Sequence, residues 1–263
     1  MSISLDERLL HALTGLAWEA ADTILPLRHA ALAVQEKADG SPVTRADAAS
    51  EAILCEGLAR LMPGVPVVSE ERAEGQAWPK AESFVLLDPL DGTREFIAGR
   101  DEFTVNIGLI AGGVPAAGVV AAPARATAWR GIVGRGAERI GRTSAAVSIA
   151  TRKFPGAAAV ALVSRSHLDA ATQALLDRAG IAQRRPCGSA LKFALLAEGA
   201  ADIYPRLAPT RAWDVAAGHA VLAAAGGRVA RANGAALRYG EAAGFVVPDF
   251  LACGDASALE RLA

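Results

Sequence analysis

Two aspartates in FVLLDPLDGTREFIAG, residues 84 to 99, have the type and spacing of a site for a divalent cation. Four apolar residues precede Asp88, which places it where a buried strand ends, and ligands commonly bind beyond such ends. Pro89 fixes one φ angle and has no N–H, so the chain must turn and can bring Asp91 back toward Asp88. The spacing therefore predicts that two carboxylates and an intervening carbonyl converge.

The chemistry of this predicted site is that of a hard cation. Like charges held so close are unfavourable unless something positive lies between them. Oxygen ligands without nearby His or Cys favour Mg²⁺, or alternatively Mn²⁺, over zinc or copper. Gly92 and Thr93 follow directly, and their backbone N–H groups can face an anion where a short helical turn begins. Metal and phosphate sites would then adjoin, although an ordinary Asp-Pro and Asp-Gly turn has the same letters.

Acidic residues at two other places extend the pattern. Glu70 and Glu71 follow an apolar run in VVSEER, and Asp214 begins a small-residue helix in RAWDVAAGHA. Each has an ordinary structural interpretation, because paired glutamates often lie in solvated turns and an aspartate in a first helical turn often caps the helix. It is their joint occurrence that favours a site.

The elements that must position these residues begin with helices and a sheet. Residues 5 to 34 have helical spacing, with Pro26 kinking or dividing the segment. A second helix should begin near Thr44, which has an acid three residues on, as in a capping box. Strands are predicted at 65 to 69, 84 to 87, 103 to 110, 114 to 123 and 127 to 134. This part indicates helices packed on a largely antiparallel sheet.

Beyond about residue 150 the rhythm changes to an alternation of strand and helix, which indicates an α/β arrangement. Strand-like segments lie at 158 to 166 and 201 to 205, and helical segments at 168 to 180, 189 to 199 and 213 to 227. We therefore predict a mixed α+β and α/β protein. Its N-terminal half, residues 1–148, would carry most of the metal ligands, and its C-terminal half, residues 149–263, would carry Asp214.

Composition excludes several classes of function. Lys plus Arg (27) nearly balance Asp plus Glu (28), so there is no basic surplus to neutralise a nucleic-acid polymer. Three separated cysteines indicate reduced thiols rather than a disulfide framework or a zinc site. No apolar run reaches the roughly 20 residues of a membrane span, and the N-terminus lacks signal-peptide features. We expect a cytoplasmic protein, with peripheral association at the inner membrane face and the oligomeric state left open.

Taken in order, the segments SEE, DPLDGT and WDVAAG resemble the inositol monophosphatase superfamily of Mg²⁺-dependent, lithium-sensitive phosphomonoesterases. Within it the chain is similar to the bacterial 3'(2'),5'-bisphosphate nucleotidases. That similarity runs from GSPVTRAD through EFTVNIGLI, SRSH and GSALKFALLAEG to YPRLAPTRAWDVAAGHA, about residues 37 to 227. The resemblance implies a layered αβαβα sandwich of the sugar-phosphatase type.

The resemblance also implies two or three Mg²⁺ ions and the residues that hold them. The metal ligands would be Glu70, Asp88, the Leu90 carbonyl, Asp91 and Asp214, supported by Glu71 from outside the coordination shell. Asp47 and Thr93 resemble the family's pair in which a carboxylate orients a threonine hydroxyl that helps deprotonate a water on the metal. With Glu70 they form the implied catalytic set. Asp47 also lies where an acid would cap the helix that begins at Thr44.

The implied substrate contacts include cations for a second phosphate. They are Glu70, Leu90, Asp91, Gly92, Thr93, His167, Ser189, Lys192, Arg206 and Asp214. Ser189 and Lys192 are three apart on one face of a predicted helix, and with His167 and Arg206 they would hold the 5'-phosphate and the rest of a nucleotide. An inositol phosphatase needs no such second anion site. It also usually has an aromatic or Asn-containing stretch where this chain has Arg94-Glu95-Phe96.

The expected activity is removal of the 3'-phosphate from adenosine 3',5'-bisphosphate, a by-product of sulfate activation, by a metal-activated water. Action on 3'-phosphoadenylyl sulfate stays open. Ala190 and Ala208 depart from the family pattern, which leaves the fine substrate preference open as well. The alternative is another phosphatase of the superfamily, acting on inositol phosphate or a sugar phosphate. A non-catalytic nucleotide sensor is remote, because the sequence keeps every metal-binding and water-activating residue that the resemblance identifies.

Overall fold

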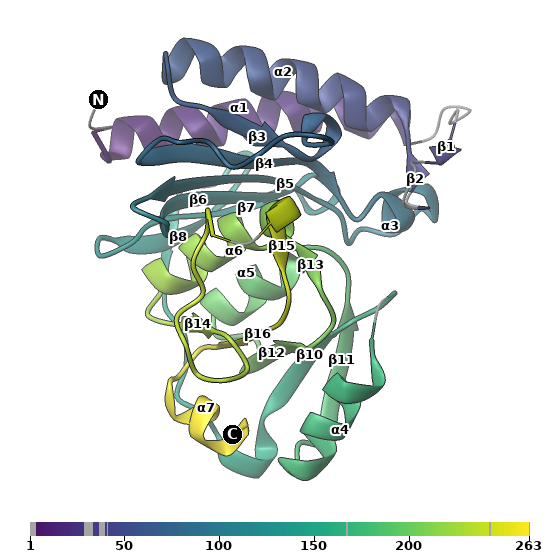
Figure 1. Cartoon of the computed structure of the whole chain (residues 1–263), viewed down its shortest axis with the longest axis vertical. Helices are drawn as coiled ribbons and strands as arrows, with labels where there is room; N and C mark the ends of the chain where they lie inside the picture. Colours follow the sequence, from purple (N-terminus) through teal and green to yellow (C-terminus); the bar gives the residue numbers. More distant parts are fainter. Residues whose placement is uncertain are drawn as a thin grey trace.

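Two β-sheets alternate with three layers of helix in the computed structural model of the chain (Figure 1). The structure describes residues 4 to 28, 34 to 36, 40, 42 to 166, 168 to 241 and 243 to 262. Helices α1 and α2 cover one face of the larger sheet, and α5 and α6 lie between the two sheets. Helices α4 and α7 cover the far side of the smaller sheet. The expected αβαβα sandwich is confirmed.

Within the described residues the α-helices are α1 (Glu7–Leu27), α2 (Arg45–Leu61), α3 (Thr93–Ile97), α4 (Ala170–Arg178), α5 (Leu191–Ala197), α6 (Ala212–Ala224) and α7 (Ser257–Leu262). The seven-stranded sheet has the order β3 (Val67–Ser69), β4 (Ser83–Asp91), β5 (Thr104–Ala111), β6 (Val114–Ala122), β7 (Thr127–Ile132), β8 (Gly136–Gly141) and β9 (Val147–Ile149). The five-stranded sheet has the order β11 (Gln183–Cys187), β10 (Val160–Ser164), β12 (Ile203–Arg206), β16 (Phe250–Cys253) and β14 (Arg228–Ala230). Two short ladders join β1 (Gln35–Glu36) to β2 (Pro42–Val43) and β13 (Thr210–Arg211) to β15 (Val246–Val247).

The prediction of a largely antiparallel first sheet is confirmed. Only β3 and β4 run parallel among its neighbouring strands, and every other pair from β4 to β9 is antiparallel. Strands β8 and β9 were not predicted, and the expected boundary between the two halves, at residues 148 and 149, falls within β9. Strands β11, β14 and β16 and helix α7 were not predicted either. Among the described helices, none is long and apolar enough to cross a membrane.

The central strands are apolar on both faces because helices cover both. On β4, Val85 and Leu87 face the core beneath α1 and α2, whereas Phe84 and Leu86 face the core shared with α5 and α6. This second core continues to Phe250 on the smaller sheet. Such two-sided burial accounts for a strand that reads as a continuous apolar run. The division of the chain near residue 149 stays a prediction, because the two halves share this core.

Helix α6 lies unusually close to the larger sheet, and this closeness places its first turn. A Cβ atom on Gly108 would lie 2.7 Å from the Ala217 nitrogen, and one on Gly118 would lie 2.4 Å from the Ala217 oxygen. Only glycine at these two strand positions allows the helix backbone to approach so closely. The approach brings Asp214, in the first turn of α6, over the end of β4.

Candidate active site

The end of β4 is a β-bulge. In the pairing with β5, Asp88 lies opposite Asn106 and Asp91 opposite Thr104, so β4 contains one extra residue there. Pro89 has no N–H to contribute to a ladder and is tolerated in a bulge for that reason. Its carbonyl accepts a hydrogen bond of 2.7 Å from the Ser50 hydroxyl. The expectation that the strand ends before Asp88 is therefore wrong, while the predicted bend between the two aspartates is present.

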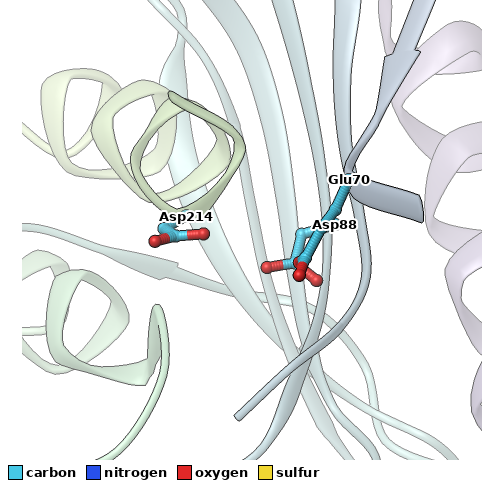
Figure 2. A group of neighbouring side chains, drawn as sticks. All are labelled: Glu70, Asp88 and Asp214. Carbon is cyan, nitrogen blue, oxygen red and sulfur yellow. The ribbon is translucent and has the colours of Figure 1, made fainter. Parts of the chain in front are cut away.

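Three carboxylates from distant parts of the chain face one space at this bulge (Figure 2). Glu70 follows β3 in a short 3₁₀ turn, Asp88 belongs to β4, and Asp214 lies in the first turn of α6. One oxygen of each lies within 4.8 Å of the others. Asp214 also accepts hydrogen bonds from the Thr210 hydroxyl and from the Arg211 N–H, so it caps α6 as well.

The electrostatics of this cluster favour a bound cation. Burial raises the pKa of Asp88 well above its usual value, and the charges of Glu70, Asp91, Asp214 and Glu71 raise it further. Burial and the Asp214 charge also raise the pKa of Asp91, to about 7, against the opposing effect of the Lys192 charge. A divalent cation would relieve the repulsion, and a donor set made of carboxylate oxygens fits Mg²⁺. The residues can therefore hold the expected metal.

Asp91 borders the same cavity, and one oxygen of its carboxylate accepts hydrogen bonds from within the protein. Its Oδ2 atom accepts hydrogen bonds from the Ala190 N–H (2.6 Å) and the Asn106 amide (3.0 Å), and a longer one from Thr104 (3.4 Å). Among the described carboxylates it lies outside the group formed by Glu70, Asp88 and Asp214. Asn106 was not predicted as a site residue. The signal for it in the sequence is a polar residue within the apolar strand that follows the motif.

Asp47 and Thr93 meet as the resemblance implied. The Thr93 hydroxyl lies 3.1 Å from Asp47 Oδ1 and 3.1 Å from the Leu90 carbonyl oxygen, and it can donate its single proton to one of them at a time. The other oxygen of Asp47 accepts from the N–H (2.7 Å) and the hydroxyl (2.8 Å) of Thr44, which confirms the capping box. Burial raises the pKa of Asp47 despite these hydrogen bonds. One carboxylate therefore caps α2 and orients Thr93.

The turn after Asp91 depends on the backbone conformation of Gly92. This residue has a φ of 90°, and it precedes α3, which begins at Thr93. A side chain there would be strained by the backbone angle, and its Cβ would lie 3.0 Å from the Glu102 carbonyl oxygen. The short helical turn expected after the motif is confirmed.

A cavity of about 570 Å³ opens over the carboxylates and is lined from both halves of the chain. Every predicted substrate contact in the described residues borders it: Glu70, Leu90, Asp91, Gly92, Thr93, Ser189, Lys192, Arg206 and Asp214. His167 lies outside the described residues. The cavity is also bordered by Arg165, Thr210, Tyr204 and Trp213, which the sequence patterns did not indicate as site residues.

Ser189 and Lys192 do not share a helical face, which corrects that expectation. Ser189 has a φ of 49° and precedes α5, which begins at Leu191. The buried Lys192 ammonium donates to the carbonyl oxygens of Ser189 (2.7 Å) and Cys187 (3.1 Å). Lys192 therefore shapes the loop before α5 while placing its positive charge beside the cavity.

Arg206 is likewise tied to backbone while it borders the cavity. Its guanidinium donates to the carbonyl oxygens of Ala208 (3.3 Å) and Pro209 (3.2 Å). The two cations thus border the same cavity as the carboxylates, with their positions set by carbonyl contacts.

The metal-free protein should lose stability as the pH rises through this cluster. Between the ordinary value of 3.8 and the folded-state pKa of about 7, folded Asp91 keeps a proton that the unfolded chain releases. Rising pH in this window therefore favours unfolding, and a metal that replaces the proton should stabilise most above it. We expect Mg²⁺ to raise the melting temperature over a chelator control more at pH 8 than at pH 5. Equal shifts at both pH values would contradict this account.

The fold and this site define the class of protein. A sequence model of the inositol monophosphatase family matches residues 5–262, so the chain belongs to this family of phosphatases. It is 40% identical over 248 residues to the 3'(2'),5'-bisphosphate nucleotidase CysQ of Escherichia coli K12, across 92% of this chain and 98% of that protein. It also resembles the crystal structure of CysQ from Bacteroides thetaiotaomicron, with a TM-score of 0.81, 30% identity and coverage of 96% and 99%. An inositol monophosphatase from Zymomonas mobilis is similar as well, with a TM-score of 0.79, 28% identity and coverage of 99% of each chain.

Proposed function

We propose that this chain is a 3'(2'),5'-bisphosphate nucleotidase that converts adenosine 3',5'-bisphosphate to AMP and phosphate with Mg²⁺ as its cofactor. The observation that carries the proposal is that one cavity combines the carboxylates of Glu70, Asp88 and Asp214 with the cations Lys192 and Arg206. A substrate with two phosphates can place one phosphate at the metal site and the other beside the two cations. The bisphosphate nucleotidases among the relatives support this choice over an inositol phosphatase.

The chain's residues divide the work between metal and substrate. Glu70, Asp88, the Leu90 carbonyl, Asp91 and Asp214 would hold two or three Mg²⁺ ions. Bound there, Mg²⁺ would lower the pKa of the attacking water and neutralise charge on the leaving oxygen. These carboxylates would hold the metal near the bulge, and Ser189, Lys192 and Arg206, which border the same cavity, would keep the nucleotide in place.

Proton handling falls to the pair that meets beneath the cavity. Asp47 accepts from the Thr93 hydroxyl, so Thr93 Oγ1 can itself accept a proton from the attacking water as its own proton moves toward Asp47. The Gly92 and Thr93 N–H groups lie at the start of α3, where they can face the transferring phosphate. The sequence contains no Cys-x₅-Arg loop, so direct attack by water suits these residues better than a covalent intermediate.

The second phosphate would be recognised by charge. Lys192 and Arg206 border the cavity with Ser189, and a 5'-phosphate placed there gains charge-assisted hydrogen bonds. 3'-Phosphoadenylyl sulfate has an anionic group at the same end and is a further candidate substrate.

A panel of phosphate esters tests the substrate. We expect kcat/KM for adenosine 3',5'-bisphosphate to exceed that for 3'-AMP, which lacks the second phosphate, by about tenfold or more. Phosphate release from inositol 1-phosphate should be slower still. A clear preference for the inositol ester would replace this proposal with an inositol monophosphatase, and equal use of 3'-AMP would remove the role of the second anion site.

A further inference from the structure

Glu102, a carboxylate outside the acidic cluster, joins the two halves of the chain beside the cavity. Glu102 precedes β5, and Arg165 follows β10 on the smaller sheet. The Arg165 guanidinium donates to Glu102 from Nε (2.7 Å) and Nη2 (2.8 Å), which is a bidentate ion pair. A second bridge lies beside it, where the Ser166 hydroxyl donates to Glu95 Oε1 at 2.7 Å.

The same Glu102 carboxylate holds the loop that carries Ser189. Its Oε2 atom accepts from the Gly188 N–H at 2.9 Å, and two residues later the Ala190 N–H donates to Asp91 at 2.6 Å. The loop of residues 188 to 190 is therefore bound at both of its ends to carboxylates of the N-terminal half, Glu102 and Asp91.

The loop packs closely against the segment of Glu102 and against Gly92. A Cβ on Gly188 would lie 2.7 Å from the Glu102 carbonyl oxygen. A Cβ on Gly92 would lie 3.4 Å from the Cβ atom of Ser189. Ser189 itself has a φ of 49°, a conformation that is uncommon for a residue other than glycine. Such a conformation persists where its surroundings over-determine it, and the two attached amides flank it.

We propose that Glu102 is a positioning residue for the substrate, acting through Arg165 and the Gly188 amide. It fixes the loop with Ser189, and the Lys192 ammonium bound to that loop, at the correct separation from the metal-binding carboxylates. The inference rests on the proposed function, since Ser189 in this loop and Lys192 beside it would hold the second phosphate. Losing the Glu102 charge should loosen substrate binding while the carboxylates and the Asp47–Thr93 pair stay in place.

The Arg231–Asp249 ion pair is a matched control within the chain. Arg231 donates to Asp249 from Nε (3.2 Å) and Nη2 (2.8 Å), and Asp249 also accepts from the Ala232 N–H (2.7 Å). The side chains are 32% and 21% exposed, against 33% and 16% for Arg165 and Glu102. This pair has the same chemistry and lies outside the residues that line the cavity.

The test compares Glu102→Gln with Asp249→Asn. We expect Glu102→Gln to raise KM for adenosine 3',5'-bisphosphate by about tenfold with kcat within about threefold, because the loss falls on substrate binding. Hydrogen exchange at the Gly188 amide should accelerate by about tenfold or more as its acceptor weakens. Arg165→Lys should raise KM less, because Glu102 can still accept from Gly188. Asp249→Asn should change neither KM nor exchange at Gly188.

The outcomes separate this inference from the proposed function. If the wild-type protein turns over a different phosphate ester, the same KM comparison is made with that ester, and exchange at Gly188 needs no substrate. An unchanged KM in Glu102→Gln would overturn the inference. So would a KM that rises equally in Asp249→Asn, because both variants would then act through general loss of stability.

Discussion

Asp88→Asn is expected to reduce turnover by about a thousandfold or more while the protein stays folded. Asp88 lies close to both Glu70 and Asp214, and in the proposed site it would be one of the metal ligands. Asparagine keeps the shape of the side chain but removes a negative ligand from the middle of the site. It also removes a buried carboxyl surrounded by like charges, so the metal-free variant should melt no lower than the metal-free wild type.

Steady-state kinetics and thermal unfolding in a chelator would measure the two effects. Asp202 provides the contrast, because it is equally buried but forms an ion pair with Arg152 (2.7 Å) away from the cavity. Asp202→Asn should lower the melting temperature and leave kcat per folded molecule within about threefold, since it breaks only a structural pair. Wild-type turnover in Asp88→Asn would refute its role as a metal ligand.

Thr93→Val is expected to lower kcat by about a hundredfold, with KM changed by less than about threefold. Valine keeps the shape of threonine but lacks the hydroxyl that lies between Asp47 and the Leu90 carbonyl. The variant therefore keeps the metal ligands and the residues that would hold the second phosphate. It loses the group that is proposed to accept the proton.

Thr14→Val is the control for Thr93→Val. Thr14 is a buried threonine whose hydroxyl donates to the Leu10 carbonyl in α1, away from the cavity. It should have wild-type kinetics. If Thr93→Val instead raised KM and left kcat unchanged, Thr93 would be a binding residue and the proton would move by another route.

Local signals in the sequence were enough to predict the first turn of α2 and the convergence at the end of β4. Thr44 and Asp47 form a capping box that depends on residues only three apart, so pattern and structure agree. Pro89 indicated a bend, but a turn after a strand and a bulge within it use the same residues. Only the register of Asp88 and Asp91 against β5 distinguishes the two.

Features that depend on tertiary contacts could not be predicted from local sequence patterns. Ser189 reads as the start of a helix, and its positive φ depends on packing against Gly92 and on amides held by Glu102 and Asp91. Asn106 and Glu102 belong to strand-like or loop-like stretches whose partners lie far along the chain. The short strands β14 and β16 have too few residues for a period to be recognised, and the sheet around them determines their pairing.

The most direct test of the central claim is to identify the product made from adenosine 3',5'-bisphosphate by ³¹P NMR, with Mg²⁺ and with excess chelator. We expect inorganic phosphate and 5'-AMP in the presence of Mg²⁺, and no release of phosphate in the chelator. Formation of 3'-AMP, or release that persists after the metal is removed, would contradict it.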